Sequence, residues 1–139
     1  MKKTTLLNAP LSHLIATMGH TDSITICDAG LPIPTSQKCI DLALTQGVPD
    51  FLSTLQAVIS ELFVEKVILA EEIKLNNPQL KQKIIAIIEQ LRIEQNKEIT
   101  LEYISHEQFK QRSAQGKGVV RTGECSPYAN VILYSGVPF

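Results

Sequence analysis

Tryptophan is absent from this chain of 139 residues, and the aromatic fraction is only 5%. Proteins that bind single-stranded nucleic acid stack the bases on aromatic side chains, so this composition argues against that function. The charges are balanced as well, with 13 Lys and Arg against 14 Asp and Glu and a net charge of -1. Such a chain creates no strong field that would attract nucleic acid or an anionic membrane.

Cysteine and histidine are equally scarce, with three of each. The odd number of cysteines and the lack of a C-x-x-C pair argue against a disulfide framework and a zinc knuckle, and so few histidines argue against a His-rich metal site. No apolar run approaches the roughly 18 residues of a membrane-spanning helix, and the start lacks the apolar core of a secretion signal. We therefore expect a cytoplasmic protein with neither a metal nor a membrane partner.

The common motifs of nucleotide and hydrolase chemistry are also missing. There is no P-loop, no G-x-G-x-x-G, no G-x-S-x-G and no H-E-x-x-H. The hydrophobic fraction of 44% and the charged fraction of 19% are nevertheless typical of a globular protein. A chain of this length forms one domain, so residues 1–139 are expected to fold as a single unit.

Hydrophobic periodicity predicts helices that alternate with strands. Helices are expected at about 9–18, from Pro49 to about 62, from Pro78 to about 94 with Asn77 as N-cap, and from His106, where Ser105 and Gln108 match a capping box. Strands are expected at 23–28, 64–70, 99–104, 119–121 and 130–134. This alternation predicts an α/β domain with a mainly parallel sheet and helices on both faces, while the strand order stays open.

Polar residues gather in loops at the expected strand ends. His20 follows a helix, Asp28 ends the first strand, His106 opens a helix, and Tyr128 and Asn130 flank the start of the last strand. Ligands of α/β proteins bind at the carboxyl ends of parallel strands, which favours a function for Asp28. From spacing alone, each of these residues also has a purely structural explanation as a cap, a turn residue or a packing residue.

Two other pairs of reactive side chains are alternative candidates for the chemistry. Cys125 with His106 would form a thiol nucleophile pair, but nothing in the sequence brings them together, and a small buried thiol is the commoner use of cysteine. Glu71 with Glu72 would form an acid/base pair, but acidic residues are common at the start of a helix. We therefore expect neither pair to carry the chemistry.

The polar loops resemble those of the D-ribose pyranase family. The resemblance covers essentially the whole chain and is most specific in the runs Gly19-His-Thr-Asp22, Cys27-Asp-Ala-Gly-Leu-Pro-Ile-Pro34, His106-Glu-Gln-Phe-Lys110 and Gly123-Glu-Cys-Ser-Pro-Tyr-Ala-Asn130. The fucose mutarotase family is a relative with the same fold, but the first and last of these runs are closer to the ribose enzymes.

The resemblance implies an isomerase that interconverts the β-pyranose and β-furanose forms of D-ribose and so supports ribose uptake and phosphorylation. In the family's pattern, His20 matches the proton donor, and Asp28, His106, Tyr128, Ala129 and Asn130 fall at sugar-binding positions. It also implies a ring-shaped homo-oligomer, a homopentamer or homodecamer, in the cytoplasm. Opening a cyclic hemiacetal needs only proton transfer, so no cofactor is expected.

Two alternatives stay open: a mutarotase for another aldose such as fucose, and a non-catalytic sugar-binding accessory of a transporter. Under all three hypotheses, the distance between His20 and Asp28 determines whether one chain can hold the whole site. The eight residue steps from His20 to Asp28, at about 3.3 Å each, span roughly 20–26 Å, far more than a ribose ring. We therefore predict a site at a subunit interface, with His20 and Asp28 contributed by different chains. The expected helix ends further predict a charged His20 and a neutral His106.

Overall fold

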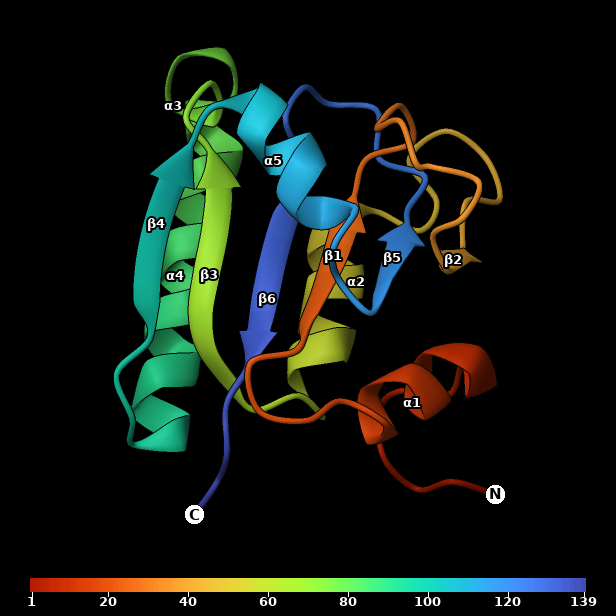
Figure 1. The fold of residues 1–139 in the computed structure, drawn as a ribbon, viewed down its shortest axis with the longest axis vertical. Coiled ribbons are helices and arrows are strands. Elements are labelled where there is room, and N and C mark those ends of the chain that lie inside the picture. The colour runs from red at the N-terminus through yellow and green to blue at the C-terminus, as the bar shows by residue number, and fades with distance from the viewer.

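Six strands form one mixed sheet at the centre of the molecule (Figure 1). The computed structural model describes all residues from Met1 to Phe139. Its strands are β1 (Ser23–Cys27), β2 (Cys39–Asp41), β3 (Val64–Ala70), β4 (Thr100–Ile104), β5 (Gly118–Arg121) and β6 (Val131–Ser135). Their order across the sheet is β2-β5-β1-β6-β3-β4. Only β6 is antiparallel to its neighbours, β1 and β3, so the prediction of a mainly parallel sheet is confirmed.

Helices cover both faces of this sheet, as the sequence predicts. The helices are α1 (Ala9–Ala16), α2 (Phe51–Ile59), α3 (Ile73–Asn76), α4 (Pro78–Gln95) and α5 (His106–Ser113). Figure 1 shows α2 and α4 behind the sheet and α5 in front of it, while α1 lies beside the amino end of β1. No helix is both long enough and apolar enough to cross a lipid bilayer.

Apolar side chains pack on both faces of the sheet. The larger cluster contains 23 buried residues and joins α1, α2 and α4 to one face. A smaller cluster of 7 buried residues seats Phe109 of α5 against the other face, where Cys27, Ile68 and Ile132 lie. Strand β1 is buried along its whole length, as its apolar run predicts. Burial raises the pKa of the Cys27 thiol far above its usual range, so this cysteine stays protonated and unreactive.

Local capping signals place the starts of several helices. The capping box of Ser105 and Gln108 is present at the start of α5, as predicted, and the Asp50 side chain caps α2. Asn77 precedes α4, also as predicted, but its side chain does not cap the helix. Its Nδ2 instead donates to the carbonyl of Pro127 at 3.0 Å, which ties the start of α4 to the 123–130 loop.

Two short elements, β2 and α3, were not predicted from the sequence. Strand β2 has three residues and α3 has four, so neither is long enough to show a hydrophobic period. Strand β2 depends on its pairing with β5, which contributes Val119, Val120 and Arg121 to the register. The remaining boundaries agree with the expected ones to within a few residues, although α1 ends at Ala16 rather than near residue 18.

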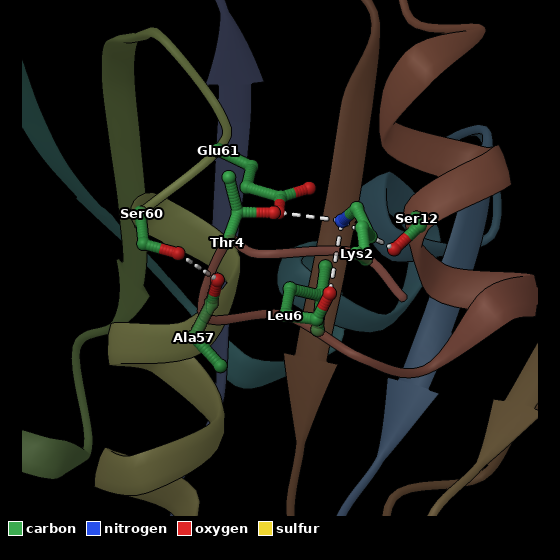
Figure 2. A network of polar contacts seen from close by, with 7 residues as sticks. All are labelled: Lys2, Thr4, Leu6, Ser12, Ala57, Ser60 and Glu61. Atoms are coloured by element: carbon green, nitrogen blue, oxygen red, sulfur yellow. Dashed lines mark hydrogen bonds and ion pairs between the residues drawn. The ribbon is translucent and has the colours of Figure 1, made fainter.

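The amino-terminal segment is fastened to α1 and to the end of α2 (Figure 2). The Lys2 ammonium bonds to a Glu61 carboxylate oxygen at 2.6 Å, to the Leu6 carbonyl at 2.9 Å and to the Ser12 hydroxyl at 3.0 Å. Thr4 donates to the same carboxylate oxygen at 2.8 Å. The hydrogen bond from Lys2 lowers the pKa of Glu61.

Candidate functional site

Polar side chains from three segments line one cleft at the carboxyl end of β1. Asp28 follows β1, His106 opens α5, and Tyr128 and Asn130 precede β6. Because β6 is antiparallel to β1, its start lies beside the end of β1, which brings Asn130 to Asp28. The cleft has a volume of about 320 Å³, and Gly30, Leu31, Pro32 and Pro127 complete its lining. The structure thus brings together the sequence-predicted Asp28, His106, Tyr128 and Asn130 at what we call the Asp28 end of the sheet.

Asp28 and Asn130 hold each other by two hydrogen bonds. The Asp28 amide donates to Asn130 Oδ1 at 2.9 Å, and Asn130 Nδ2 donates to Asp28 Oδ2 at 2.8 Å. The other carboxylate oxygen, Oδ1, accepts from the Gly30 amide at 2.9 Å. Asn130 is only 1% exposed, so a buried side chain fixes the position of the Asp28 carboxylate. Each carboxylate oxygen keeps further acceptor capacity, which suits it to binding hydroxyl groups of a ligand.

The imidazole of His106 is held on several sides. Its ring meets Tyr128 edge-on at 5.2 Å between centroids and stacks on Phe109 at 6.3 Å. Its backbone amide donates to both carboxylate oxygens of Glu72, at 3.0 and 3.1 Å. His106 Nδ1 is buried and has no hydrogen-bond partner. Because Nδ1 is enclosed by the protein, Nε2 is the ring nitrogen available to a ligand.

Glu124 fixes the loop that leads to Tyr128 and was not singled out from the sequence. Its Oε1 accepts from the amides of Cys125 and Ser126, both at 3.1 Å. Its Oε2 accepts from the amide of Phe51 at the start of α2, at 3.3 Å. Its backbone carbonyl accepts from the Ala29 amide at 2.8 Å. One glutamate therefore joins the loop, a helix start and the segment after Asp28.

Tyr128 has a backbone φ of +56°, which is uncommon for any residue other than glycine. Such strain persists where the surroundings enforce it, and it is concentrated at functional sites. The next residue, Ala129, is fully buried and packs in the core, so, unlike the other predicted binding residues, it does not line the cleft of this chain.

His20 lies at the opposite end of β1, which we call the His20 end of the sheet. Its side chain is 54% exposed, and its Nε2 bonds to Glu65 Oε2 at 2.8 Å. The five residues of β1, at about 3.3 Å each, separate it from Asp28 by roughly 15 Å or more. One chain therefore does not bring His20 into the cleft with the other predicted site residues.

The carboxylate that bonds to His20 is not the one nearest to it in the sequence. Asp22 is the nearest acid in sequence, but it accepts from the Gly19 amide at 2.8 Å and pairs with Lys117 at 3.2 Å. The bond from Gly19 lowers the pKa of Asp22. Helix α1 ends at Ala16, so its dipole, which acts only within the last turn, does not reach His20. The carboxylate that bonds to the His20 ring is that of Glu65.

Neither of the alternative reactive pairs is assembled. The Cys125 thiol donates to a backbone carbonyl two residues away at 3.4 Å rather than to His106. Glu71 pairs with Lys74 at 2.8 Å, whereas Glu72 bonds to the His106 amide. No group of three or more His, Cys, Asp and Glu side chains is placed to hold a metal ion.

The strand-end cleft lies on a small mixed α/β sheet, and the chain can be assigned to a protein family. The family model described as the RbsD / FucU transport protein family matches residues 1–138, and the chain belongs to that family. Among its relatives, "D-ribose pyranase" of Glaesserella parasuis is 70% identical and that of Haemophilus influenzae 60% identical, each over 139 residues and 100% of both chains. The family resemblance inferred from the sequence is thereby confirmed.

Solved structures agree with this assignment. Bacillus subtilis RbsD complexed with D-ribose is 46% identical, with a TM-score of 0.86 over 100% of both chains. The fucose mutarotase from Streptococcus pneumoniae in complex with L-fucose is 24% identical, with a TM-score of 0.77 over 94% of this chain and 93% of that one. The second similarity shows a shared fold and no more.

Proposed function

We propose that this protein is an isomerase that interconverts the β-pyranose and β-furanose forms of D-ribose, in support of ribose uptake and phosphorylation. The observation that carries the proposal is the 70% identity over the full chain with a relative named D-ribose pyranase. The relative that was solved with D-ribose, 46% identical, supports ribose as the ligand. We place the reaction in the cytoplasm, where a sugar that has entered the cell meets its kinase.

The chemistry needs proton transfer alone. Opening of ribopyranose requires a proton at the ring oxygen while the bond from that oxygen to the anomeric carbon breaks, and the anomeric hydroxyl gives its proton to water to leave the aldehyde. The free aldehyde then rotates, and a different hydroxyl closes the five-membered ring with the reverse proton movements. One general acid contributes about 10²- to 10⁴-fold, which suits a reaction that also proceeds unaided in water.

We assign the proton transfer to His20 and the binding of sugar hydroxyls to the Asp28 end. Histidine changes charge near neutral pH, so it can donate on opening and accept on closure. The Asp28 carboxylate accepts hydroxyl hydrogens, and neutral His106 donates through Nε2. Tyr128, Ala129 and Asn130 complete the proposed binding residues.

We further propose that His20 reaches the sugar from a neighbouring subunit of a homopentameric or homodecameric ring. The separation of His20 from the cleft along β1 supports this arrangement. In a ring, one asymmetric interface repeats, so each interface can hold one complete site.

Exchange NMR on isotopically labelled ribose tests the activity. Faster exchange between pyranose and furanose signals supports the proposed reaction, and the His20→Ala variant serves as the control. Faster exchange between anomers alone would instead indicate a mutarotase of the fucose type. Ribose binding without faster exchange would indicate a non-catalytic sugar-binding accessory.

Mixed oligomers test the shared site. His20→Ala and Asp28→Ala chains are unfolded and refolded together in equal amounts; random assembly then leaves about a quarter of the interfaces with both residues intact, and activity returns in that proportion. The matched control mixes Asp28→Ala with His106→Ala, because both residues line the cleft of one chain and their loss cannot be complemented. Failure of the first mixture to regain activity beyond the second would contradict the shared site.

A further inference from the structure

We propose that Glu65 is the positioning residue of His20: its carboxylate holds Nε2 and leaves Nδ1 as the nitrogen that exchanges a proton with the sugar. This inference rests on the proposed function, since it concerns the part of His20 in ring opening. Glu65 itself takes up no proton in the reaction and touches no reacting atom. It lies 45 residues from His20 in the sequence, so no local pattern indicates the pair.

The bond between the two side chains is short and has no competitor. His20 Nε2 lies 2.8 Å from Glu65 Oε2, and His20 Nδ1 makes no hydrogen bond within the chain. Glu65 forms no other ion pair, and the adjacent Lys66 pairs with Glu102. The acid nearest to His20 in sequence, Asp22, is occupied by Gly19 and Lys117. Glu65 is thus the carboxylate committed to His20.

The backbone at Glu65 is built irregularly. The pairing of β3 with β6 is regular from Lys66 to Leu69, but the register shifts between Val64 and Lys66. Glu65 is therefore the extra residue of a β-bulge. Bulges redirect a side chain, and they are frequent beside active sites. Here the redirected side chain is the one that meets His20.

The end of β6 leaves space for this carboxylate. A Cβ added at Gly136 would lie 3.0 Å from Glu65 Cβ, 3.1 Å from Phe63 Cδ1 and 3.3 Å from Glu65 Oε2, the oxygen that bonds to His20. The loop that carries His20 is anchored to the same strand end, since the Thr21 amide donates to the Ser135 carbonyl at 2.8 Å. Loop, bulge and strand end together set the position of the imidazole.

A fixed carboxylate on one imidazole nitrogen has two chemical effects. It determines which nitrogen carries the permanent proton, and it stabilises the charged ring. With Nε2–H directed to Glu65, the proton given to the ring oxygen on opening leaves from Nδ1. On closure, the proton of the attacking hydroxyl returns to Nδ1, so the residue ends the cycle as it began.

The test compares Glu65→Gln and Gly136→Ala with the control Glu102→Gln. The control removes the carboxylate of another pair on this sheet, and its side chain has the same 37% exposure as that of Glu65. We expect both test variants to slow pyranose–furanose exchange at saturating ribose by at least about tenfold. The effect should not exceed the roughly 10²- to 10⁴-fold that a general acid contributes to the rate. Ribose affinity should change less than about threefold, because Glu65 binds no sugar. The control should match the wild type.

A second readout separates positioning from simple stabilisation. The ¹⁵N shifts of the His20 ring should show Nε2 protonated in the wild type and in Glu102→Gln, with a mixture of tautomers in Glu65→Gln. Exchange and ring shifts that are unchanged in Glu65→Gln would overturn the assignment of Glu65. If the wild type itself fails to accelerate exchange, the proposed function fails, whereas the ¹⁵N shifts still decide whether Glu65 sets the tautomer of His20.

Discussion

The two ends of the sheet hold their functional side chains in different ways. At the Asp28 end, the carboxylate of Asp28 accepts two hydrogen bonds and Asn130 is 1% exposed beneath it. At the His20 end, the side chain of His20 is 54% exposed and is held by its single bond to Glu65. The first arrangement is a fixed set of hydrogen-bonding groups within one chain, and the second is an exposed imidazole with one partner.

This difference suggests a division of labour. A binding cleft gains from rigidity, because ordered donors and acceptors lose little entropy when the sugar arrives. A proton donor that acts in a neighbouring subunit must be exposed on the surface of its own chain. Substitutions at the two ends should therefore have different signatures in rate, affinity and stability.

The largest effect is expected for His20→Ala at the exposed end. Loss of the proton donor should slow exchange by about 10²- to 10⁴-fold at saturating ribose, while ribose affinity changes little. The free energy of unfolding should change by less than about 0.5 kcal/mol, because the side chain is exposed and supports no buried group. Exchange NMR, titration calorimetry and thermal melts measure the three quantities. A marked loss of stability would show that the two ends are not as different as the contacts indicate.

Asp28→Ala should combine two effects that stay separate at the other end. The substitution removes the acceptor of the Asn130 amide and of the Gly30 amide, which should cost about 1–3 kcal/mol of unfolding free energy. Ribose affinity should fall as well, because the carboxylate acts on the bound sugar in ground and transition states alike. Chemical denaturation and calorimetry follow the two losses. Unchanged affinity in a folded Asp28→Ala protein would remove Asp28 from the sugar site.

Acid should loosen the His20 end through Asp22. The bond from the Gly19 amide lowers the pKa of this carboxyl, so its contribution to stability is present above the usual value of 3.8 and is lost as pH falls below that value. The shift of the Gly19 amide proton, followed by NMR from pH 6 downward, should titrate below 3.8 in the wild type. It should not titrate in Asp22→Asn. A midpoint above 3.8 would contradict the lowered pKa.

The smallest effect is expected for Cys125→Ser, close to the Asp28 end. The exposed thiol makes one weak bond to a backbone carbonyl, and a hydroxyl can replace it. Exchange rate and ribose affinity should stay within about twofold, and stability within about 0.5 kcal/mol. An inactive Cys125→Ser protein that still folds would restore the thiol hypothesis and count against proton transfer by His20.

Sequence reasoning succeeded where the signal is local. The capping box at Ser105 spans three residues, and the apolar run of β1 is continuous, so both were readable from the chain. The residues proposed to bind sugar at the Asp28 end were identified only through runs that resemble a known family. Their grouping in one cleft also follows from physics, because strand ends collect at the edge of a sheet.

The contacts that the sequence did not reveal join residues far apart in the chain. Glu65 bonds to His20 across 45 residues, Glu72 to His106 across 34, and Glu124 to Phe51 across 73. A glutamate in a helix start or a strand looks like a solvated charge until its partner is known. The strand order was unreadable for the same reason, since β2 and β5 pair across most of the chain.

Strand β6 carries a consequence for how the chain acquires its shape during synthesis. It is the last strand to leave the ribosome, yet it lies between β1 and β3, and without it the sheet separates into β2-β5-β1 and β3-β4 (Figure 1). Asn130 precedes this strand at the Asp28 end, and Gly136 follows it beside Glu65 at the other. A nascent chain can therefore form helices and partial sheets, but both halves of the proposed site are assembled in one late, long-range pairing step.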